Sequence, residues 1–415
     1  MPSYPKVKLN KYHYLIILFS PFVFLMHGLV QKSVDIKFKA AFVFCVFFGV
    51  YFITSSPETD GYRHLENFKK YENNGFEIFT NHFENVLNKK ADPELYVPLV
   101  NFILSRFTTS GSVLFGFHAF VYAFFYISSL RLVYEKAKFS RNNLTLGLFL
   151  MIIFLFPIHQ INGVRWFTAM WCFVYCALRY FNGEKRFLFY AFGAGLIHFS
   201  LFVAPVFLLL SLLIGYRPKI LLAIAIISFA IPRVQGSSLV DNESAVGIES
   251  LDNRVGSYNN ESNIEQRQIG LAKTNWYVRF RYEAIFYFMA IMGVVYLWFH
   301  FKSAKSLFSE KLYSFLFLWG SMVNFTFNIP SFGGRMRFLF WILLAIFFYI
   351  EITEKKVRFE KPLGYLAIGA ILLYALVDFR AYSNWVSAQI ISTPITLLFT
   401  DPLEVTLSKF VFFWE

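Results

Sequence analysis

Two arginines stand where an apolar helix is expected to begin, and this position suits them to bind an anion. Arg165 follows residues 156–164, FPIHQINGV, a short polar interruption between two long apolar runs. Arg335 follows residues 331–334, SFGG, whose glycines would let a phosphate approach the bare backbone. A helix start offers free N–H groups and a positive dipole end, and a guanidinium binds two phosphate oxygens at once. The alternative is an arginine that only snorkels to a membrane interface.

Two further arginines are candidates for the same anion. Arg337 lies two residues after Arg335, so a regular helix would point the two side chains in different directions. We therefore favour Arg335 as the ligand and Arg337 as its anchor or helper. Arg279 stands at the end of a long polar segment, next to the following apolar run.

Three residues are candidates for a general base that takes a proton from a hydroxyl group: Glu94, His198 and Asp60. Glu94 ranks first because it directly precedes a short apolar helix. A histidine such as His198 can instead pack between helices and bond a neighbouring carbonyl. Asp60 has an equally simple structural alternative, the N-cap of a surface helix that begins at Gly61.

Aromatic side chains near these positions could stack on sugar rings, although anchoring at a membrane interface would explain them equally well. They are Tyr62, Tyr96 and Trp166. Neither a nucleotide-binding motif nor a zinc or iron ligand cluster is visible, so we expect no cofactor and no metal. The three cysteines, Cys45, Cys172 and Cys176, fall inside apolar runs without metal or disulfide spacing.

The composition requires a membrane to accommodate these elements. The chain of 415 residues is 57% hydrophobic, 21% aromatic and only 16% charged. Repeated apolar runs of 16 to 25 residues predict an all-α polytopic membrane protein with about 12 transmembrane helices. The net charge of +13 arises mainly from short loops between these runs, so it reports orientation in the membrane and not nucleic-acid binding.

The predicted spans follow the apolar runs and form one transmembrane domain over residues 1–415. They are residues 14–30, 38–53, 113–133, 144–161, 164–181, 220–231, 282–299, 312–329, 338–350 and 363–377. The run 187–214 is too long for one ordinary span and short for two, and Gly193, Gly195, His198 and Pro205 interrupt it. We read it as a bent helix or a hairpin pair.

Three polar regions are expected outside the membrane core. Residues 54–110 predict an outer-face loop with amphipathic helices, because Tyr62, Leu65, Phe68 and Tyr71 recur at helical spacing. Residues 96–107 within it are too short to span. Residues 233–278 form a long outer-face loop that could act as a lid, and residues 380–415 an interfacial tail. With a hairpin at 187–214, six basic loops share one side, which the positive-inside rule assigns to the cytoplasm.

Several short motifs, taken in order, resemble the EpsG-type exopolysaccharide and O-antigen polymerase family. They are Thr59-Asp60-Gly61-Tyr62, Glu94-Leu95-Tyr96 before Asn101, Asn162-Gly163-Val164-Arg165, Ile197-His198-Phe199-Ser200 and Gly334-Arg335. The set spans most of the chain. The family commonly has an Arg-Gln pair where this chain has Arg165-Trp166, so no role is assigned to that glutamine.

The resemblance implies a Wzy-like polymerase with a fold like that of the integral-membrane (GT-C-type) glycosyltransferases. Its substrates would be undecaprenyl-diphosphate-linked repeat units, joined on the periplasmic face of the bacterial inner membrane. Membrane lipids and a chain-length regulator are the further partners it implies. An O-antigen ligase would use the same donor. A flippase would carry its charges at the midplane, and an acyltransferase would need a buried histidine open to the cytoplasm.

Overall fold

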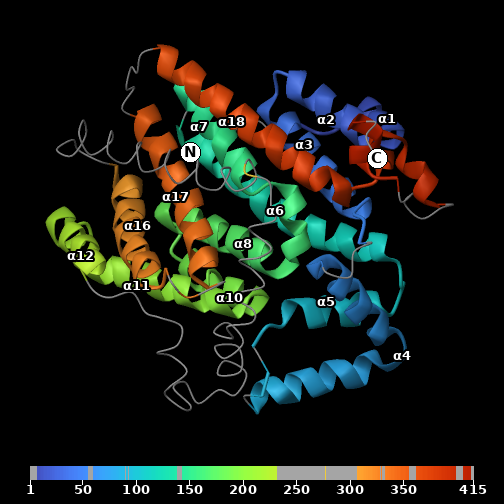
Figure 1. The fold of residues 1–415 in the computed structure, drawn as a ribbon, viewed down its shortest axis with the longest axis horizontal. Helices are drawn as coiled ribbons and strands as arrows, with labels where there is room; N and C mark the ends of the chain where they lie inside the picture. Colours follow the sequence, from blue (N-terminus) through green and yellow to red (C-terminus); the bar gives the residue numbers. More distant parts are fainter. Residues whose placement is uncertain are drawn as a thin grey trace.

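The computed structural model is a bundle of helices (Figure 1). It describes residues 7–54, 59–88, 90–91, 93–137, 143–230, 276, 306–327, 329, 332–354, 361–398 and 405–412. In these residues β-type pairing is limited to two isolated bridges, Phe52 with Val386 and Ser387 with Thr406. The expected lid at 233–278, the span 282–299 and Arg279 lie outside the described residues, Trp276 excepted.

Long apolar helices form the centre of the bundle. Three stretches of the described residues are long and apolar enough to cross a membrane: Gly111–Lys136, Asn143–Phe181 and Phe332–Glu354. They correspond to α6 (Gly111–Ala137), α7 with α8 (Asn143–Leu155 and Val164–Phe181) and α17 (Phe332–Glu354). The described residues are thus almost entirely helical, and their long apolar helices are consistent with a membrane protein.

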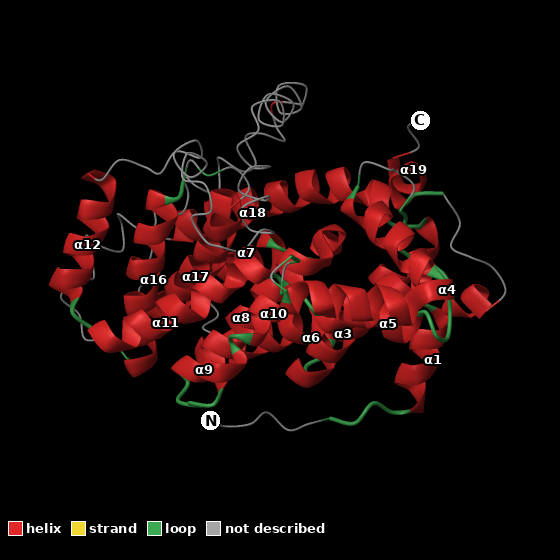
Figure 2. Cartoon of the chain, turned by 90° about the horizontal axis from the view of Figure 1, so that it is seen from below, coloured by secondary structure: helices red, strands yellow, loops and turns green. Residues whose placement is uncertain are grey.

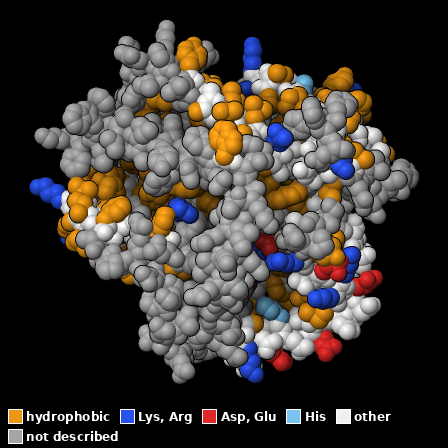
Figure 3. Space-filling view, viewed as in Figure 1, with side chains coloured by type: hydrophobic (Ala, Val, Ile, Leu, Met, Phe, Trp, Pro, Cys, Tyr) orange, Lys and Arg blue, Asp and Glu red, His pale blue; other side chains and the backbone are white. Residues whose placement is uncertain are grey.

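Shorter or more polar helices surround this centre. In both views α12 and α16 lie toward one end of the molecule, and α4 lies toward the other (Figures 1 and 2). The bounds of the outer helices are α12 Pro218–Ala230, α16 Leu307–Phe325, α18 Lys361–Tyr382 and α19 Leu407–Phe412. Charged side chains gather over the region of α4, while the rest of the described surface in this view is mainly hydrophobic (Figure 3).

The first predicted span, residues 14–30, is wrong as a single helix. The structure has α1 (Lys11–Phe19) and α2 (Pro21–Val30), with Ser20 extended between them at φ −166° and ψ 124°. A proline disfavours helical geometry in the residue before it and has no N–H to continue the ladder. The Ser20 hydroxyl donates to the carbonyl of Ile391 at 2.7 Å, which ties the break to the C-terminal tail.

The apolar run 187–214 is also interrupted, as its glycines and proline predict. It consists of α9 (Phe187–Tyr190), α10 (Gly193–Ile197), a 3₁₀ turn η2 (Phe199–Phe202) and α11 (Val203–Ile214). His198 stands between α10 and η2 with an extended backbone, φ −146° and ψ 114°. The interruption therefore places a histidine at the point where helical hydrogen bonding stops.

The polar region after α3 (Val34–Val50) folds into one long amphipathic helix and one short helix. α4 (Asp60–Leu87) has a kink at Asn74, and Arg106 donates to the freed carbonyl of Tyr71 at 2.7 Å. An inserted side chain of this kind is a common cause of a helix kink. α5 (Tyr96–Leu104) has nine residues, too few to span a bilayer, as its sequence predicts.

The polar hinge before Arg165 forms a 3₁₀ helix, η1 (Ile158–Gly163), between α7 and α8. α8 begins at Val164, so Arg165 lies in its first turn as expected. The Tyr122 hydroxyl on α6 donates to the carbonyl of Phe156 at 2.6 Å, and Trp171 Nε1 donates to the same carbonyl at 3.2 Å. These bonds satisfy a carbonyl at the break between α7 and η1.

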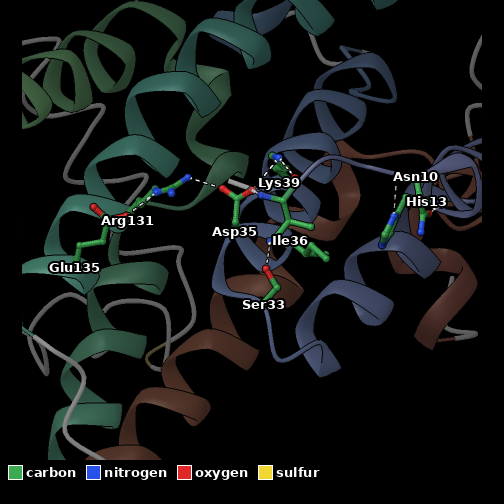
Figure 4. Close-up of polar contacts among 9 residues, drawn as sticks. Asn10, His13, Ser33, Asp35, Ile36, Lys39, Arg131 and Glu135 are labelled. Carbon is green, nitrogen blue, oxygen red and sulfur yellow. Dashed lines mark hydrogen bonds and ion pairs between the residues drawn. The ribbon is translucent and has the colours of Figure 1, made fainter. Parts of the chain in front are cut away.

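A charged cluster holds the start of α3 against the C-terminal part of α6 (Figure 4). Asp35, 2% exposed, accepts from Arg131 Nη1 at 2.7 Å, from Lys39 Nζ at 2.8 Å and from the Val7 amide at 3.0 Å. Arg131 also donates to Glu135 at 2.8 Å. A buried carboxylate with three donors fixes the relative position of the two helices.

Candidate functional site

Glu94 and Arg165 form a short ion pair across 71 residues of sequence. Arg165 Nη1 lies 2.6 Å from Glu94 Oε2. Glu94 is placed just before α5 and its side chain is 6% exposed, whereas the Arg165 side chain at the start of α8 is 36% exposed. The pair thus joins a buried carboxylate to a guanidinium that still reaches solvent.

The second oxygen of Glu94 faces the interruption between α10 and η2. Glu94 Oε1 accepts from the Phe199 amide at 3.3 Å and lies 3.7 Å from His198 Nδ1. The neighbouring backbone is fixed as well, because the Leu95 amide donates to the carbonyl of Leu196 at 2.9 Å. His82 Nε2 lies 3.0 Å from the Glu94 carbonyl. The broken helix therefore supplies both an N–H group and an imidazole to this carboxylate.

His198 connects this pair to the second arginine. Arg335 is in the first turn of α17. Its Nη1 atom lies 3.2 Å from His198 Nε2. A guanidinium only donates, so Nε2 faces it as the acceptor. Nδ1 lies 2.9 Å from the Ser200 hydroxyl and accepts from the Ser200 amide at 3.4 Å. Both ring nitrogens of His198 are therefore engaged.

Arg165, Glu94, His198 and Arg335 thus form a continuous polar chain, here called the Arg–Glu–His–Arg chain. It links the N-terminal turns of α8 and α17, the two helices whose starts the sequence marks as anion sites. The structure brings four of the predicted site residues together, from four separate parts of the sequence.

Arg337 is not part of this chain. Its guanidinium lies 4.9 Å from the ring centre of Phe327 and 5.6 Å from that of Trp341. Its Nε is buried without a hydrogen-bond partner among the described residues. Arg337 stacks on aromatic rings, while Arg335, two residues earlier, contacts His198.

Asp60 lies on the exposed first turn of α4, with 59% of its side chain accessible and Arg63 3.5 Å away. It is not the N-cap that the sequence suggests. The cap is Thr59, whose hydroxyl accepts from the Tyr62 amide at 3.3 Å, so α4 begins one residue earlier than expected. Thr59 and Asp60 are neighbours in the sequence, and only the structure shows that the Thr59 side chain caps the helix.

The three aromatic candidates have different surroundings. Trp166 is 4% exposed and lies edge-on to His198, with ring centres 5.4 Å apart, so its ring is buried and not presented to a sugar. The Tyr96 hydroxyl lies 2.9 Å from His118 Nδ1 on α6. Tyr62 is half-buried on the first turn of α4.

Two residues to which the sequence assigns no role in the site lie next to the Arg–Glu–His–Arg chain. The Asn162 side chain in η1 accepts from the Gly61 amide at 2.9 Å and so joins α4 to the hinge before Arg165. Burial, and then the positive charge of Arg165, lower the pKa of His64 to about 4, with Asp60 acting in the opposite direction. His64 therefore stays neutral near pH 7 and adds no positive charge beside Arg165.

A further polar contact joins the hinge to the end of α18: His159 Nε2 lies 2.7 Å from Asp378 Oδ2. A histidine inside a polar hinge and an aspartate at the end of an apolar run were visible signals, but nothing in the sequence pairs them. Within the part of the chain that the structure describes, no group of three His, Cys, Asp or Glu residues is arranged to hold a metal ion.

Comparison with known proteins places these residues in a family. A family model described as the EpsG family matches residues 39–392, a stretch that contains most of α3, α4 to α18 and all four residues of the Arg–Glu–His–Arg chain. No curated protein and no solved structure matches the chain. Because the match covers most of the chain, the protein belongs to the EpsG family, a family of Wzy-like polymerases of polysaccharide synthesis.

Proposed function

We propose that this protein joins undecaprenyl-diphosphate-linked oligosaccharide repeat units into an O-antigen or exopolysaccharide. The observation that carries the proposal is that Arg165 and Arg335, each in the first turn of a long apolar helix, are connected through Glu94 and His198. Two guanidiniums at two helix N-termini form a site for a doubly charged group such as a diphosphate.

The ion pair of Arg165 with Glu94 is compatible with this role because Arg165 remains partly open to solvent. A guanidinium has five N–H donors, and Arg165 uses only its Nη1 nitrogen to bond Glu94. A diphosphate oxygen therefore binds the remaining donors while Glu94 keeps the side chain in place. Glu94 and His198 act in this arrangement as positioning residues for the two arginines.

In the proposed reaction a hydroxyl of the acceptor repeat attacks the anomeric carbon of the donor repeat. The bond from that carbon to the diphosphate oxygen breaks, and its electron pair leaves with the lipid diphosphate. Arg165 and Arg335 stabilise the charge that develops on the leaving group. Arg337 supports α17 from its aromatic site, and Arg279 remains a further candidate ligand.

The proposed setting is the outer, periplasmic face of the bacterial inner membrane, with a bundle of about twelve spans and a GT-C-like architecture. The topology is supported by the described ends of the helices. The basic residues Lys39, Arg131 and Lys136 lie at one end of α3 and α6, and α4 with Asp60 and His64 follows the other end of α3. Basic residues are enriched on the cytoplasmic side.

The test uses purified protein in nanodiscs with defined lipid-diphosphate-linked repeats. Wild type is expected to make products of two and more repeats, and Arg165→Ala and Arg335→Ala to make none. Lysine at either position should restore little, because an ammonium group offers one point charge in place of a fork. Arg63→Ala is the matched control, since Arg63 is an exposed arginine of the same face.

Other outcomes separate the rival functions. Transfer of a single repeat to a lipid A–core acceptor, without joining of repeats, would indicate a ligase. Movement of the lipid-linked repeat across the bilayer without any new glycosidic bond would indicate a flippase. Wild-type product lengths from either alanine variant would remove that arginine from the site.

A further inference from the structure

The pair of His159 and Asp378 is built like a proton-transfer dyad. His159 Nε2 lies 2.7 Å from Asp378 Oδ2, and both side chains are nearly buried, at 11% and 4% exposure. The imidazole is stacked on the ring of Tyr382, with centres 4.0 Å apart and planes 16° apart. Tyr382 in turn meets Trp385 edge-on at 4.6 Å. The ring of His159 is therefore held in one plane and one orientation.

The contact with Asp378 sets the tautomer of His159. An ionised carboxylate only accepts, so the hydrogen of the neutral ring lies on Nε2 and Nδ1 carries the free lone pair. Gln160 Nε2 lies 3.3 Å from the same Nε2 atom, but an amide NH2 group only donates, so with the hydrogen on Nε2 this longer contact is not a hydrogen bond and the contact with Asp378 at 2.7 Å sets the tautomer. The polar contacts of the His159 ring within the described residues are made through Nε2, and none is made through Nδ1. An aspartate that fixes a histidine tautomer in this way prepares the opposite nitrogen to accept a proton.

The dyad lies beside the proposed donor site. His159 is in η1 and Arg165 in the first turn of α8, the helix that continues from it. Arg165 follows His159 by six residues, and with about 2 Å per residue in a 3₁₀ helix and 1.5 Å in an α-helix these residues rise by at most about 11 Å. This separation is within the length of two sugar residues and their diphosphate.

Glu94 and His198 are less suited to take the proton. Both oxygens of Glu94 are already engaged, by Arg165 and by the Phe199 amide, and His198 accepts from Arg335. Protonation of Glu94 would remove the charge that holds Arg165 just when the leaving diphosphate needs that arginine. The His159 dyad carries no such conflict.

We infer that His159 is the general base of the polymerisation and that Asp378 positions it. This inference rests on the function proposed above. The acceptor hydroxyl gives its proton to His159 Nδ1 as its oxygen forms the new bond to the anomeric carbon. The imidazolium that forms is stabilised by Asp378 and later returns the proton to solvent or to the departed diphosphate.

The test must separate a base from a latch that merely joins α18 to the hinge. His159→Gln keeps an amide that can donate to Asp378, but it cannot accept the proton. We expect kcat to fall by roughly 10²- to 10⁴-fold, the usual range for loss of a general base, with the KM for the donor within about 2-fold. Asp378→Asn should lower kcat in the same way, and Asp378→Glu should restore part of it.

Asp35→Asn is the matched control, because Asp35 is also a buried, ion-paired carboxylate but belongs to the charged cluster between α3 and α6. It should lower thermal stability and leave kcat unchanged. A His159→Gln variant with near-wild-type kcat would overturn the inference and leave the proposed function standing. A His159→Gln variant that loses stability and donor affinity together with kcat would also overturn the inference, because that result indicates a structural latch. Folded wild type that joins no repeats would refute both.

Discussion

The ion pair of Glu94 and Arg165 should respond very differently to the loss of its two members. Arg165→Ala leaves the Glu94 carboxylate, whose side chain is 6% exposed, without its cation. Glu94→Gln leaves Arg165 charged, but 36% of that side chain is exposed and can be hydrated. The cost of breaking a buried ion pair depends on which charge remains behind.

The exposures set the magnitudes. An unpaired buried charge costs about 3–5 kcal/mol, and we expect Arg165→Ala to lie in that range. An unpaired Arg165 can be hydrated, so the loss of its partner costs far less. We expect Glu94→Gln to lower the free energy of unfolding by about 1–2 kcal/mol, most of it from the weakened bond to the Phe199 amide. The double variant removes the stranded carboxylate and should be more stable than Arg165→Ala alone, by about 2 kcal/mol.

Thermal unfolding of the purified variants in one detergent measures their order of stability. Wild type should be the most stable, then Glu94→Gln, then the double variant close to it, with Arg165→Ala the least stable. The double variant should still make no polymer, which separates the structural effect of Arg165 from its effect on the diphosphate. If Arg165→Ala were as stable as wild type, or the double variant less stable than both single variants, the described burial of Glu94 would be wrong.

Two further predictions concern packing and orientation. A Cβ at Gly333 would overlap the carbonyl oxygen of Thr326, whereas at Gly334 the nearest atom is Arg337 Nη2 at 3.9 Å. Gly333→Ala should therefore cost about 1–3 kcal/mol by overpacking and Gly334→Ala little stability, and equal losses in thermal unfolding would contradict this. A cysteine at Arg63, on α4, should react with an impermeant thiol reagent in intact spheroplasts, while one at Lys136, at the end of α6, should react only after lysis. The reverse labelling pattern would invert the proposed topology.

The sequence by itself determined the class of the protein and the approximate positions of its main helices, and for α8 it also determined both ends. Hydropathy predicts α8 over residues 164–181, and the helix has these bounds. The position of Arg165 in its first turn follows from the polar hinge before it, and the interruption of 187–214 follows from its glycines and Pro205. These features are local, because they depend on hydrophobicity and on the backbone preferences of glycine and proline.

The break at Ser20 was missed because hydropathy alone treats residues 14–30 as continuous. Pro21 was a local signal for it, but the bond that stabilises the break is made by Ile391, 371 residues away. The cap of α4 was misplaced by one residue for a similar reason, since Thr59 and Asp60 have comparable preferences.

Only the tertiary structure decided how the site is assembled. Arg165 meets Glu94 across 71 residues, and Arg335 meets His198 across 137. The sequence marked each of these four residues by its place at the end of a helix, but it did not show which residue each would contact in space. Helix ends can meet in many combinations, and the packing of side chains from distant helices selects one of them. The contact of His159 with Asp378 exists because the end of α18 packs at the hinge, a choice that no local pattern of residues contains.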